Sequence, residues 1–285
     1  MIFIKKNYRS GYGFVKSKEG ITLIELMVAM AVAGIVLMAI YSAYHTQSSM
    51  YRTQTVVLNM QQNIRGGLYL MEREIRMAGY DQDDTGNFGI TDIRFYDINN
   101  SLNSNGNSAI TFTSDLNDNG IIDSNETYSF SIFDYPVSTP DGIIDLARVV
   151  GSGGRQIIAE SIEALFLAYA YDNNGDGMLD TSANGNIIWA FDSDNNNILD
   201  RILDTNDDGE IDIDDSTAGT SIGGSGVAVG SIRAVKVWLL ARTKTAMLKY
   251  TDNNTYVVGN RRITPDDNFK RELLVTTIKC RNMGM

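Results

Sequence analysis

The stretch that decides the fold reads Gly20-Ile21-Thr22-Leu23-Ile24-Glu25-Leu26-Met27-Val28-Ala29, and it opens an apolar run that reaches Tyr44. No charged residue occurs from Leu26 to Tyr51. A helix over 26–44 would rise by roughly 28 Å, close to the roughly 30 Å thickness of the hydrocarbon core of a bilayer. The sequence therefore predicts a membrane-spanning helix over residues 21–45.

Residues 1–20 form a short basic leader before this helix, with five Lys and Arg residues against Glu19. The positive-inside rule places such a leader in the cytoplasm and the rest of the chain outside it. The apolar run could be a removable signal peptide or a retained anchor. A signal peptide ends at a cleavage site with small residues, whereas here the helical pattern continues, which favours the anchor.

Beyond the apolar run, residues 46–79 show the pattern of an amphipathic helix. Apolar residues recur every three or four positions, with Gln, Arg and Glu between them. These are Val56, Val57, Met60, Ile64, Leu68, Met71 and Ile75. No proline occurs before Pro136, and Gly79 is well placed to end the helix. One helix from about Ile21 to Ala78 is predicted, with an all-apolar first half and an amphipathic second half.

Glu25 is the unusual residue of the apolar half, because a charge at mid-bilayer costs about 2.5–3.5 kcal/mol. One interpretation is an interfacial carboxylate that the dipole of the helix N-terminus stabilises. The other is a carboxylate that awaits a cation from another chain. The residues alone leave both open.

The string from Gly20 to Ala29, with its basic leader, resembles the processing site of type IV prepilins and pseudopilins. This resemblance implies that a prepilin peptidase cuts after Gly20 and methylates the new amine of Ile21, which stands where the family most often has Phe. It also implies that Glu25 pairs with the Ile21 amine of a neighbouring subunit, with Thr22 helping to hold the junction. A partner offsets much of the cost of a buried carboxylate.

Three later segments resemble PilW-like minor pilins: residues 70–80 at the helix end, 232–243 as a core strand and 271–282 as the closing strand. The resemblance implies a subunit of a type IV pilus and not an enzyme. It implies a single-pass inner-membrane protein with a periplasmic head that later reaches the pilus and cell surface. The implied partners are major and minor pilins, prepilin peptidase, the inner-membrane assembly platform and, before assembly, membrane lipid. Priming of assembly, or a place at the pilus tip, is the expected role.

The sequence pattern of residues 80–285 predicts a β-rich head. Runs rich in β-branched and aromatic residues alternate with connections rich in Asn, Asp and Gly. The runs are 90–98, 109–113, 127–133, 156–159, 162–171, 187–191, 232–242, 255–258 and 273–280. The fold class is α+β: an antiparallel sheet laid against the second half of a long N-terminal helix, as in the pilin fold.

The loop from Asp115 to Glu126 fills a twelve-residue calcium-binding template, with a glycine at position six for the sharp turn. Side-chain oxygens are expected at positions one, three, five, nine and twelve, and a carbonyl at position seven. The predicted ligands are Asp115, Asn117, Asn119, Ile121, Asp123 and Glu126. Strand-like runs flank this loop, so the sequence predicts an EF-hand-like loop in a sheet and a structural Ca²⁺.

Two further loops repeat the template. The loop at 172–180 keeps the first nine positions but has Ala183 at position twelve, and the loop at 204–215 reaches Asp215 there. Their predicted ligands are Asp172, Asn174, Asp176, Met178, Asp180, Asp204, Asn206, Asp208, Glu210, Asp212 and Asp215. A weaker copy at 192–200 has Asn197 in place of the turn glycine, and 141–145 is a fragment. Each could instead be an Asx-Gly turn without metal.

Composition excludes several classes of function. The chain has 285 residues, a formal charge of -11, one Cys and one His. A negative chain is a poor general binder of nucleic acid, and a disulfide framework or a His/Cys zinc site lacks the necessary residues. Residues 81–215 carry 27 acidic and four basic groups, and 216–285 carry eleven basic and four acidic groups. The acidity is therefore concentrated in the loops that resemble calcium sites.

Two alternatives to a pilus subunit stay open. Pseudopilins of type II secretion systems share the processing site and include calcium-binding members. A secreted calcium-binding adhesin or enzyme would use the apolar segment as a removed signal peptide. The start of the mature chain separates this second alternative from the pilin interpretation.

Overall fold

The computed structural model describes residues 20–83, 85–96, 102–103, 106–134 and 143–284. Helix α1 (Leu23–Ile75) is continuous over 53 residues, which confirms the predicted helix to within three residues at either end. Gly79 follows it with a φ of 76°, and its N–H donates to the Thr113 carbonyl at 3.0 Å. Nearly all of the predicted leader, 1–19, lies outside the described residues.

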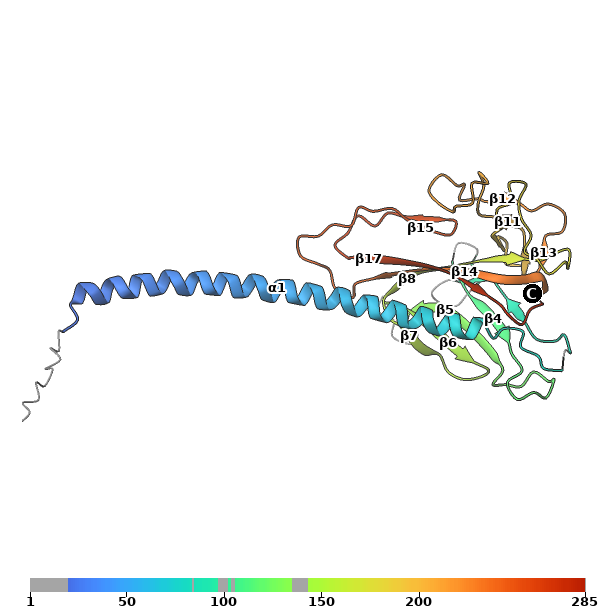
Figure 1. The fold of residues 1–285 in the computed structure, drawn as a ribbon, viewed down its shortest axis with the longest axis horizontal. Coiled ribbons are helices and arrows are strands. Elements are labelled where there is room, and N and C mark those ends of the chain that lie inside the picture. The colour runs from blue at the N-terminus through green and yellow to red at the C-terminus, as the bar shows by residue number, and fades with distance from the viewer. Residues whose placement is uncertain (1–19, 84, 97–101, 104–105, 135–142, 285) are drawn as a thin grey trace, which may run out of the picture. The chain divides into compact units, whose positions relative to one another are not determined.

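The chain separates into two compact units, Met1–Arg52 and Thr53–Met285. The division falls inside α1, so the first part of the helix belongs to one unit and its last turns to the other (Figure 1). The domain boundaries predicted at 45 and 79 stay predictions. In the first unit the described side chains are exposed almost throughout.

The second unit contains two antiparallel sheets where the sequence predicted one. The first has the order β1-β4-β5-β6-β7. Its strands are β1 (Ile90–Asp92), β4 (Ile110–Thr113), β5 (Thr127–Asp134), β6 (Ile144–Val150) and β7 (Gln156–Ala159). Neighbouring strands follow each other along the chain, so short connections build most of this sheet.

The second sheet has the order β12-β11-β9-β8-β14-β17. Its strands are β8 (Ile162–Tyr171), β9 (Ala190–Phe191), β11 (Arg201–Ile202), β12 (Thr220–Ser221), β14 (Ile232–Arg242) and β17 (Arg271–Lys279). The long strand β14 lies between β8 and β17, and all three pair antiparallel. Between β8 and β14 the chain forms the acidic loops at 172–180, 192–200 and 204–215, whereas the loop at 115–126 joins β4 to β5 of the first sheet.

Short elements complete the head. In the described residues there are also three two-stranded pairs, and a 3₁₀ turn precedes β14. They are β2 (Phe95–Tyr96) with β3 (Asn107–Ser108), β10 (Ile198–Leu199) with β13 (Val227–Ala228), β15 (Tyr256–Val258) with β16 (Arg261–Ile263), and η1 (Val229–Ser231).

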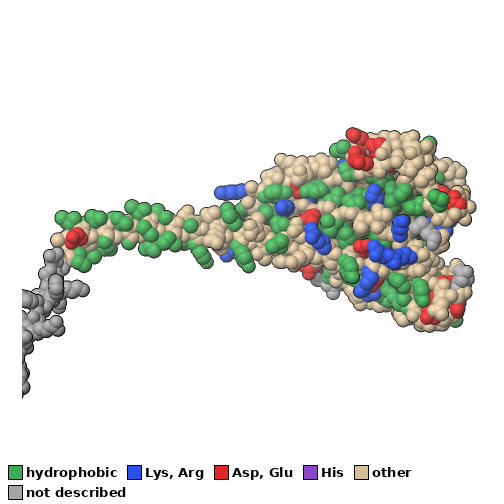
Figure 2. Space-filling view, in the orientation of Figure 1, with side chains coloured by type: hydrophobic (Ala, Val, Ile, Leu, Met, Phe, Trp, Pro, Cys, Tyr) green, Lys and Arg blue, Asp and Glu red, His purple; other side chains and the backbone are tan. Residues whose placement is uncertain are grey.

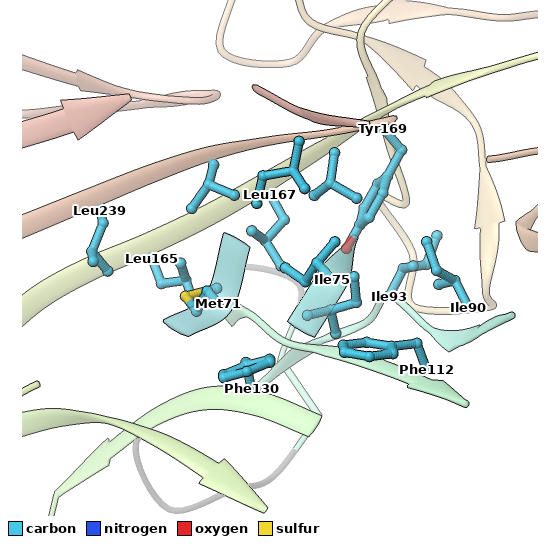
Figure 3. Close-up of a cluster of buried hydrophobic side chains, with 14 of the residues drawn as sticks. Met71, Ile75, Ile90, Ile93, Phe112, Phe130, Leu165, Leu167, Tyr169 and Leu239 are labelled. Atoms are coloured by element: carbon cyan, nitrogen blue, oxygen red, sulfur yellow. The ribbon is translucent and has the colours of Figure 1, made fainter. Parts of the chain in front are cut away.

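The last turns of α1 pack into the main core of the head. Met71 and Ile75 lie among Phe130 of the first sheet and Leu165 and Leu239 of the second (Figure 3). All five side chains are fully buried. The amphipathic pattern over 56–75 is therefore explained, because its apolar stripe supplies the contact that joins helix and sheets.

A second apolar cluster covers the other face of the second sheet. Along β8, Leu165 and Leu167 belong to the main core, whereas Ala164, Phe166 and Ala168 belong to the second cluster. Successive side chains of a strand point to opposite faces. Because both faces of β8 are covered, the strand is apolar throughout and is buried along most of its length.

Most predicted strands are confirmed, three of them residue for residue at 156–159, 162–171 and 232–242. The sequence missed β6, whose Asp145 is the last residue of the fragment at 141–145 that resembled a calcium loop. Asp145 instead lies in the strand, is 5% exposed, and accepts a hydrogen bond from the Ser161 N–H. The predicted strand 90–98 is two short strands, and its last two residues lie outside the described part.

Candidate functional site

The start of α1 holds the residues of the predicted processing and assembly site. The Thr22 N–H and Oγ1 both donate to Glu25 Oε2 at 2.9 Å, and the Glu25 N–H donates to Thr22 Oγ1 at 3.3 Å. This reciprocal arrangement is a capping box, which satisfies donors that a helix N-terminus leaves without partners. Thr22 thus orients Glu25 within its own chain. Gly20 and Ile21 precede the helix and are exposed.

The helix that follows presents an apolar surface that no other described residue covers. Within the described residues, α1 is the one helix that is long and apolar enough to cross a membrane, judged by length and composition. Ile24, Leu37 and Met38 are 72%, 66% and 73% exposed. Figure 2 shows hydrophobic side chains all along this part of the helix, with acidic groups at its start. Such a surface requires lipid or other chains around it.

The predicted calcium loop at 115–126 is curled around its first side chain. The Asp115 carboxylate accepts hydrogen bonds from the backbone N–H of Asn119 at 3.2 Å and of Gly120 at 2.8 Å. Asn119 Oδ1 in turn accepts from the Ile121 N–H at 2.8 Å. Asp118 and Gly120 adopt left-handed backbone conformations, with φ of 57° and 69°. Alternating conformations of this kind turn the odd-numbered side chains toward the inside of the loop.

The same pattern recurs in the loops that begin at Asp172, Asp192 and Asp204. In each, the first carboxylate accepts from the N–H of the sixth residue, at 2.7–2.9 Å. The fifth side chain accepts from the N–H of the seventh residue, at 2.8–2.9 Å. The fourth and sixth residues have positive φ in every copy. The hydrogen bonds place the side chains at positions three and five as the template expects, namely Asn174, Asp176, Asn206 and Asp208. Position seven, occupied by Met178 and Glu210, donates its N–H to the side chain at position five.

The four loops close in two ways. In 115–126 and 204–215, the carboxylate at position twelve accepts from the N–H groups of positions two and nine: Glu126 from Leu116 and Asp123, and Asp215 from Thr205 and Asp212. In 172–180 and 192–200, the carboxylate at position nine accepts from position two: Asp180 from Asn173, and Asp200 from Ser193. The short loops thus close three residues earlier.

The loop at 192–200 keeps the same backbone geometry as the other copies, although Asn197 replaces the turn glycine. Asn197 nevertheless adopts a φ of 66°, since Asn tolerates the left-handed region better than most residues. A related turn at 81–86 was missed altogether. Asp81 Oδ2 accepts from the Gly86 N–H at 2.9 Å, and Gly86 has a φ of 74°. The spacing Asp81, Asp83, Thr85, Gly86 was the available signal.

The donor chemistry of the first loop suits a hard cation. Asp115 and Glu126 are both 0% exposed, and among the described residues neither forms an ion pair with Lys or Arg. The amide nitrogens of Asn117 and Asn119 donate to Asp123 Oδ2 at 2.7 and 2.9 Å. Oxygen donors of this kind are those that Ca²⁺ prefers.

Within the described part of the chain, however, no three His, Cys, Asp or Glu side chains come together as a group that could hold a metal ion. The remaining oxygens of the template belong to Asn side chains and to backbone carbonyls. At position seven, Ile121 and Met178 have side chains that are 65% and 70% exposed, so only their carbonyls could serve.

In the loop at 192–200, burial raises the pKa of Asp192, which disfavours its charged form in the absence of a cation.

Three family models match the chain. Residues 15–41 match the prokaryotic N-terminal methylation motif, residues 53–142 match prepilin peptidase-dependent protein B, and residues 145–282 match type IV pilus-assembly protein W, or PilW. No curated protein sequence matches. Among solved structures, a type IV-like pilin from Thermus thermophilus is similar, with 12% identity and a TM-score of 0.40 over 79% of this chain and 98% of that one.

The methylation motif covers the capped start of α1 and most of its exposed apolar half, and the other two matches cover the head. The chain is therefore a type IV pilin-like protein. The PilW match covers residues 145–282, from β6 to β17 and including the second sheet, and it supports a minor pilin within that class. The family resemblance stated from the sequence is confirmed.

Proposed function

We propose that this minor pilin is cleaved after Gly20, methylated on the amine of Ile21 and assembled into a type IV pilus through the first half of α1. The exposed and largely apolar surface from Leu23 to Tyr44, in which the capped Glu25 is the one charged residue, carries the proposal. Such a surface is stable in a bilayer and again among other apolar helices. The same segment thus serves as membrane anchor and as filament core.

In this proposal Glu25 selects the neighbouring subunit. Thr22 holds one carboxylate oxygen, Oε2, while the carboxylate stays at the helix start. Cleavage after Gly20 would create a positive amine at Ile21, and the amine of an adjacent subunit would pair with Glu25. An isolated charge in an apolar surrounding is costly and a paired one is much less so. Pairing therefore favours the axial register in which amine and carboxylate meet.

The proposed route starts in the inner membrane, with α1 spanning it once and the head in the periplasm. An assembly platform would then extract the subunit from lipid and pass it to major and minor pilins. The β-rich head of residues 80–285 is larger than a repetitive subunit needs, which supports a role in priming assembly or at the tip. We propose no catalytic activity for it.

The assembly proposal is tested with Glu25→Val in the full-length protein in its native host. We expect prepilin peptidase to cleave this variant normally, because the cleavage site is intact, while its amount in sheared pili falls steeply. Leu37→Val is the matched control: it changes the same exposed helix without a charge and is expected to assemble. Normal amounts of Glu25→Val in pili would contradict the pairing.

We further propose that Ca²⁺ binds the loops at 115–126 and 204–215, with 172–180 and 192–200 as weaker sites. The buried carboxylates of Asp115 and Glu126, which form no ion pair with Lys or Arg among the described residues, support this most directly. A bound Ca²⁺ would neutralise them and would hold the loops onto the sheets. The position-twelve carboxylate distinguishes the two complete loops, because it supplies the bidentate ligand.

The calcium proposal is tested by thermal unfolding of the full chain in detergent, with excess Ca²⁺ and with excess EDTA. At a Ca²⁺ concentration about 100 times Kd, the stabilisation is about 2.7 kcal/mol per site. Glu126→Gln should remove most of the contribution of the first loop. Asp214→Asn removes a charge from the acidic segment at a position the template does not use, and should change little. An identical melting temperature with Ca²⁺ and EDTA would contradict the proposal.

The two alternatives give different outcomes. A pseudopilin of a secretion system would show the same mature start but would be absent from sheared pili and required for secretion. A secreted adhesin or enzyme would lack the apolar half of α1 in its mature form.

A further inference from the structure

Strand β17 forms an open edge of the second sheet. Among the described strands it pairs only with β14. The Cys280 N–H donates to the Arg233 carbonyl at 2.9 Å, and Arg233 stands opposite Cys280 in the β14 register. Hydrogen-bonded pairs alternate along an antiparallel ladder. The backbone groups of Leu273, Val275, Thr277 and Lys279 therefore point away from β14, to the outside of the sheet.

Two hollows lie along this edge. One, of about 470 Å³, is lined by Arg76, Thr277, Lys279 and Arg281. The other, of about 460 Å³, lies toward the end of α1 and shares Arg76 and Arg281 with the first. Because the two hollows share these residues, they form one groove between the helix end and the edge of β17. All of its residues belong to the second compact unit.

The groove carries a positive charge that nearby carboxylates offset only in part. Four of its lining residues are basic, namely Arg73, Arg76, Lys279 and Arg281, and Glu72 is the one acidic residue that lines either hollow. Arg76 pairs with Glu72 and Arg73 with Glu74, whereas within the described residues Lys279 and Arg281 form no ion pair. Lys279 and Arg281 are exposed, and Figure 2 shows Lys and Arg side chains gathered beside hydrophobic ones on this side of the head. The charge is opposite to that of the acidic middle of the chain.

We propose that the edge of β17 binds an extended acidic segment of another protein chain, which adds to the second sheet as a further strand. The outward N–H and C=O groups would pair with its backbone, and Lys279, Arg281 and Arg76 would pair with its carboxylates. Strand addition of this kind combines backbone hydrogen bonds for affinity with side-chain contacts for specificity.

The charge argues against the two other occupants of the groove. Two copies of β17 placed edge to edge would bring their basic residues together, and charged edges discourage such self-pairing. A nucleic acid would satisfy the basic side chains but could not pair with the repeating N–H and C=O groups of a strand. An acidic peptide backbone satisfies both features.

The test uses the full-length protein in detergent and a fluorescent peptide, acetyl-Thr-Glu-Val-Glu-Thr-Glu-Val-Glu-amide, with binding followed by anisotropy. A peptide with Lys in place of Glu tests the charge, and one with N-methylated alternate residues tests the backbone pairing. We expect the first peptide to bind and both altered peptides to bind about tenfold more weakly or worse. Equal binding of the N-methylated peptide would overturn strand addition.

Two protein variants probe the groove from the other side. Thr277→Pro removes one outward N–H and leaves the bonds to β14, and edge strands tolerate proline. The double variant Lys279→Glu with Arg281→Glu reverses the charge. Both should weaken peptide binding about tenfold, with an unchanged melting temperature when no peptide is present. Lys249→Glu, at an exposed lysine that lines neither hollow, should leave binding unchanged.

A single-stranded DNA oligonucleotide of the same net charge is the competitor. Failure of the oligonucleotide to displace the peptide supports the proposal. Displacement, with equal binding to the wild-type protein and to Thr277→Pro, would show a general anion-binding surface and would overturn it. This outcome is independent of whether Glu25 or Ca²⁺ acts as proposed above.

Discussion

The two halves of α1 are one helix with opposite surroundings. Leu37 and Met38 in the first half are 66% and 73% exposed, whereas Met71 and Ile75 in the second half are 0% exposed. Neither half contains proline. The difference lies in how apolar residues are distributed, all round the first half and along one stripe of the second. The second half finds its partner in the chain, and the first half requires one outside it.

The largest contrast between the halves is expected for a pair of methionines. Met71→Ala removes a buried side chain and should lower the free energy of unfolding of the head by about 2–5 kcal/mol. Met38→Ala removes the same atoms from an exposed site and should change it by close to zero. Urea unfolding of the full chain in detergent, followed by the fluorescence of Trp189 and Trp238, measures both. Equal effects would contradict the division of α1 into two roles.

A buried ion pair also ties the second half to the first sheet. Arg148 on β6 donates from Nε to Glu74 Oε2 at 2.7 Å, and the two side chains are 19% and 10% exposed. Arg148→Ala leaves Glu74 without its main partner and should cost about 3 kcal/mol. Arg52 is an exposed arginine on α1, the helix that carries Glu74. Arg52→Ala is therefore the control, and it should cost less than about 0.5 kcal/mol. A cost for Arg148→Ala as small as for Arg52→Ala would show that the pair adds nothing.

Alanine substitutions at two adjacent glycines of α1 should change the stability of the fold in opposite directions. A Cβ on Gly67 would lie 2.8 Å from the Cβ of Ala159 on β7, so Gly67→Ala should destabilise the head by about 1–3 kcal/mol. A Cβ on Gly66 meets nothing within 4 Å, so Gly66→Ala should stabilise the helix by about 0.4–1 kcal/mol. The same urea unfolding distinguishes them. Destabilisation by both would mean that the packing of the helix on β7 is not the cause.

The smallest expected effect concerns how the stability of the head falls at acid pH. Hydrogen bonds from Arg271 lower the pKa of Asp267 to about 2, against about 3.9 for an unfolded chain. A lowered pKa stabilises the fold above the unfolded value, and this contribution is lost as the pH falls from about 4 to about 2. Asp267→Asn should therefore flatten the acid dependence of head stability in that window and leave the first half of α1 unaffected. If this variant loses stability between about pH 4 and pH 2 as steeply as the wild-type protein, then other carboxylates cause that loss.

Much of this architecture could be predicted from the sequence, because its signals are local. The apolar run and the stripe from Val56 to Ile75 defined α1, and the β-branched runs defined the long strands. Strand β6 was missed because its charged residues Asp145 and Arg148 have partners that are distant in sequence. For the same reason, one sheet was expected where two exist: local alternation does not determine which strands pair.

The candidate sites also differ in whether their residues are close together in the sequence, and this decides which of them could be predicted. The capping box of Thr22 and Glu25 spans four residues, so the sequence could suggest it. The calcium template is also local, and the structure repeats its hydrogen bonds in four loops. The left-handed conformation of Asn197 could not be predicted from its residue type alone, since the backbone around it also determines that conformation. The groove beside β17 was not predictable, because it joins the end of α1 to a strand some 200 residues later.

The start of the mature chain tests the central claim most directly. Mass spectrometry of the N-terminal peptide of the protein, recovered from membranes and from sheared pili, measures it. The proposal predicts an N-methylated Ile21 in both fractions, so that the whole apolar half of α1 is retained. A mature start beyond Tyr44 would mean that this half is a discarded signal peptide, and would contradict the proposal that it builds the filament.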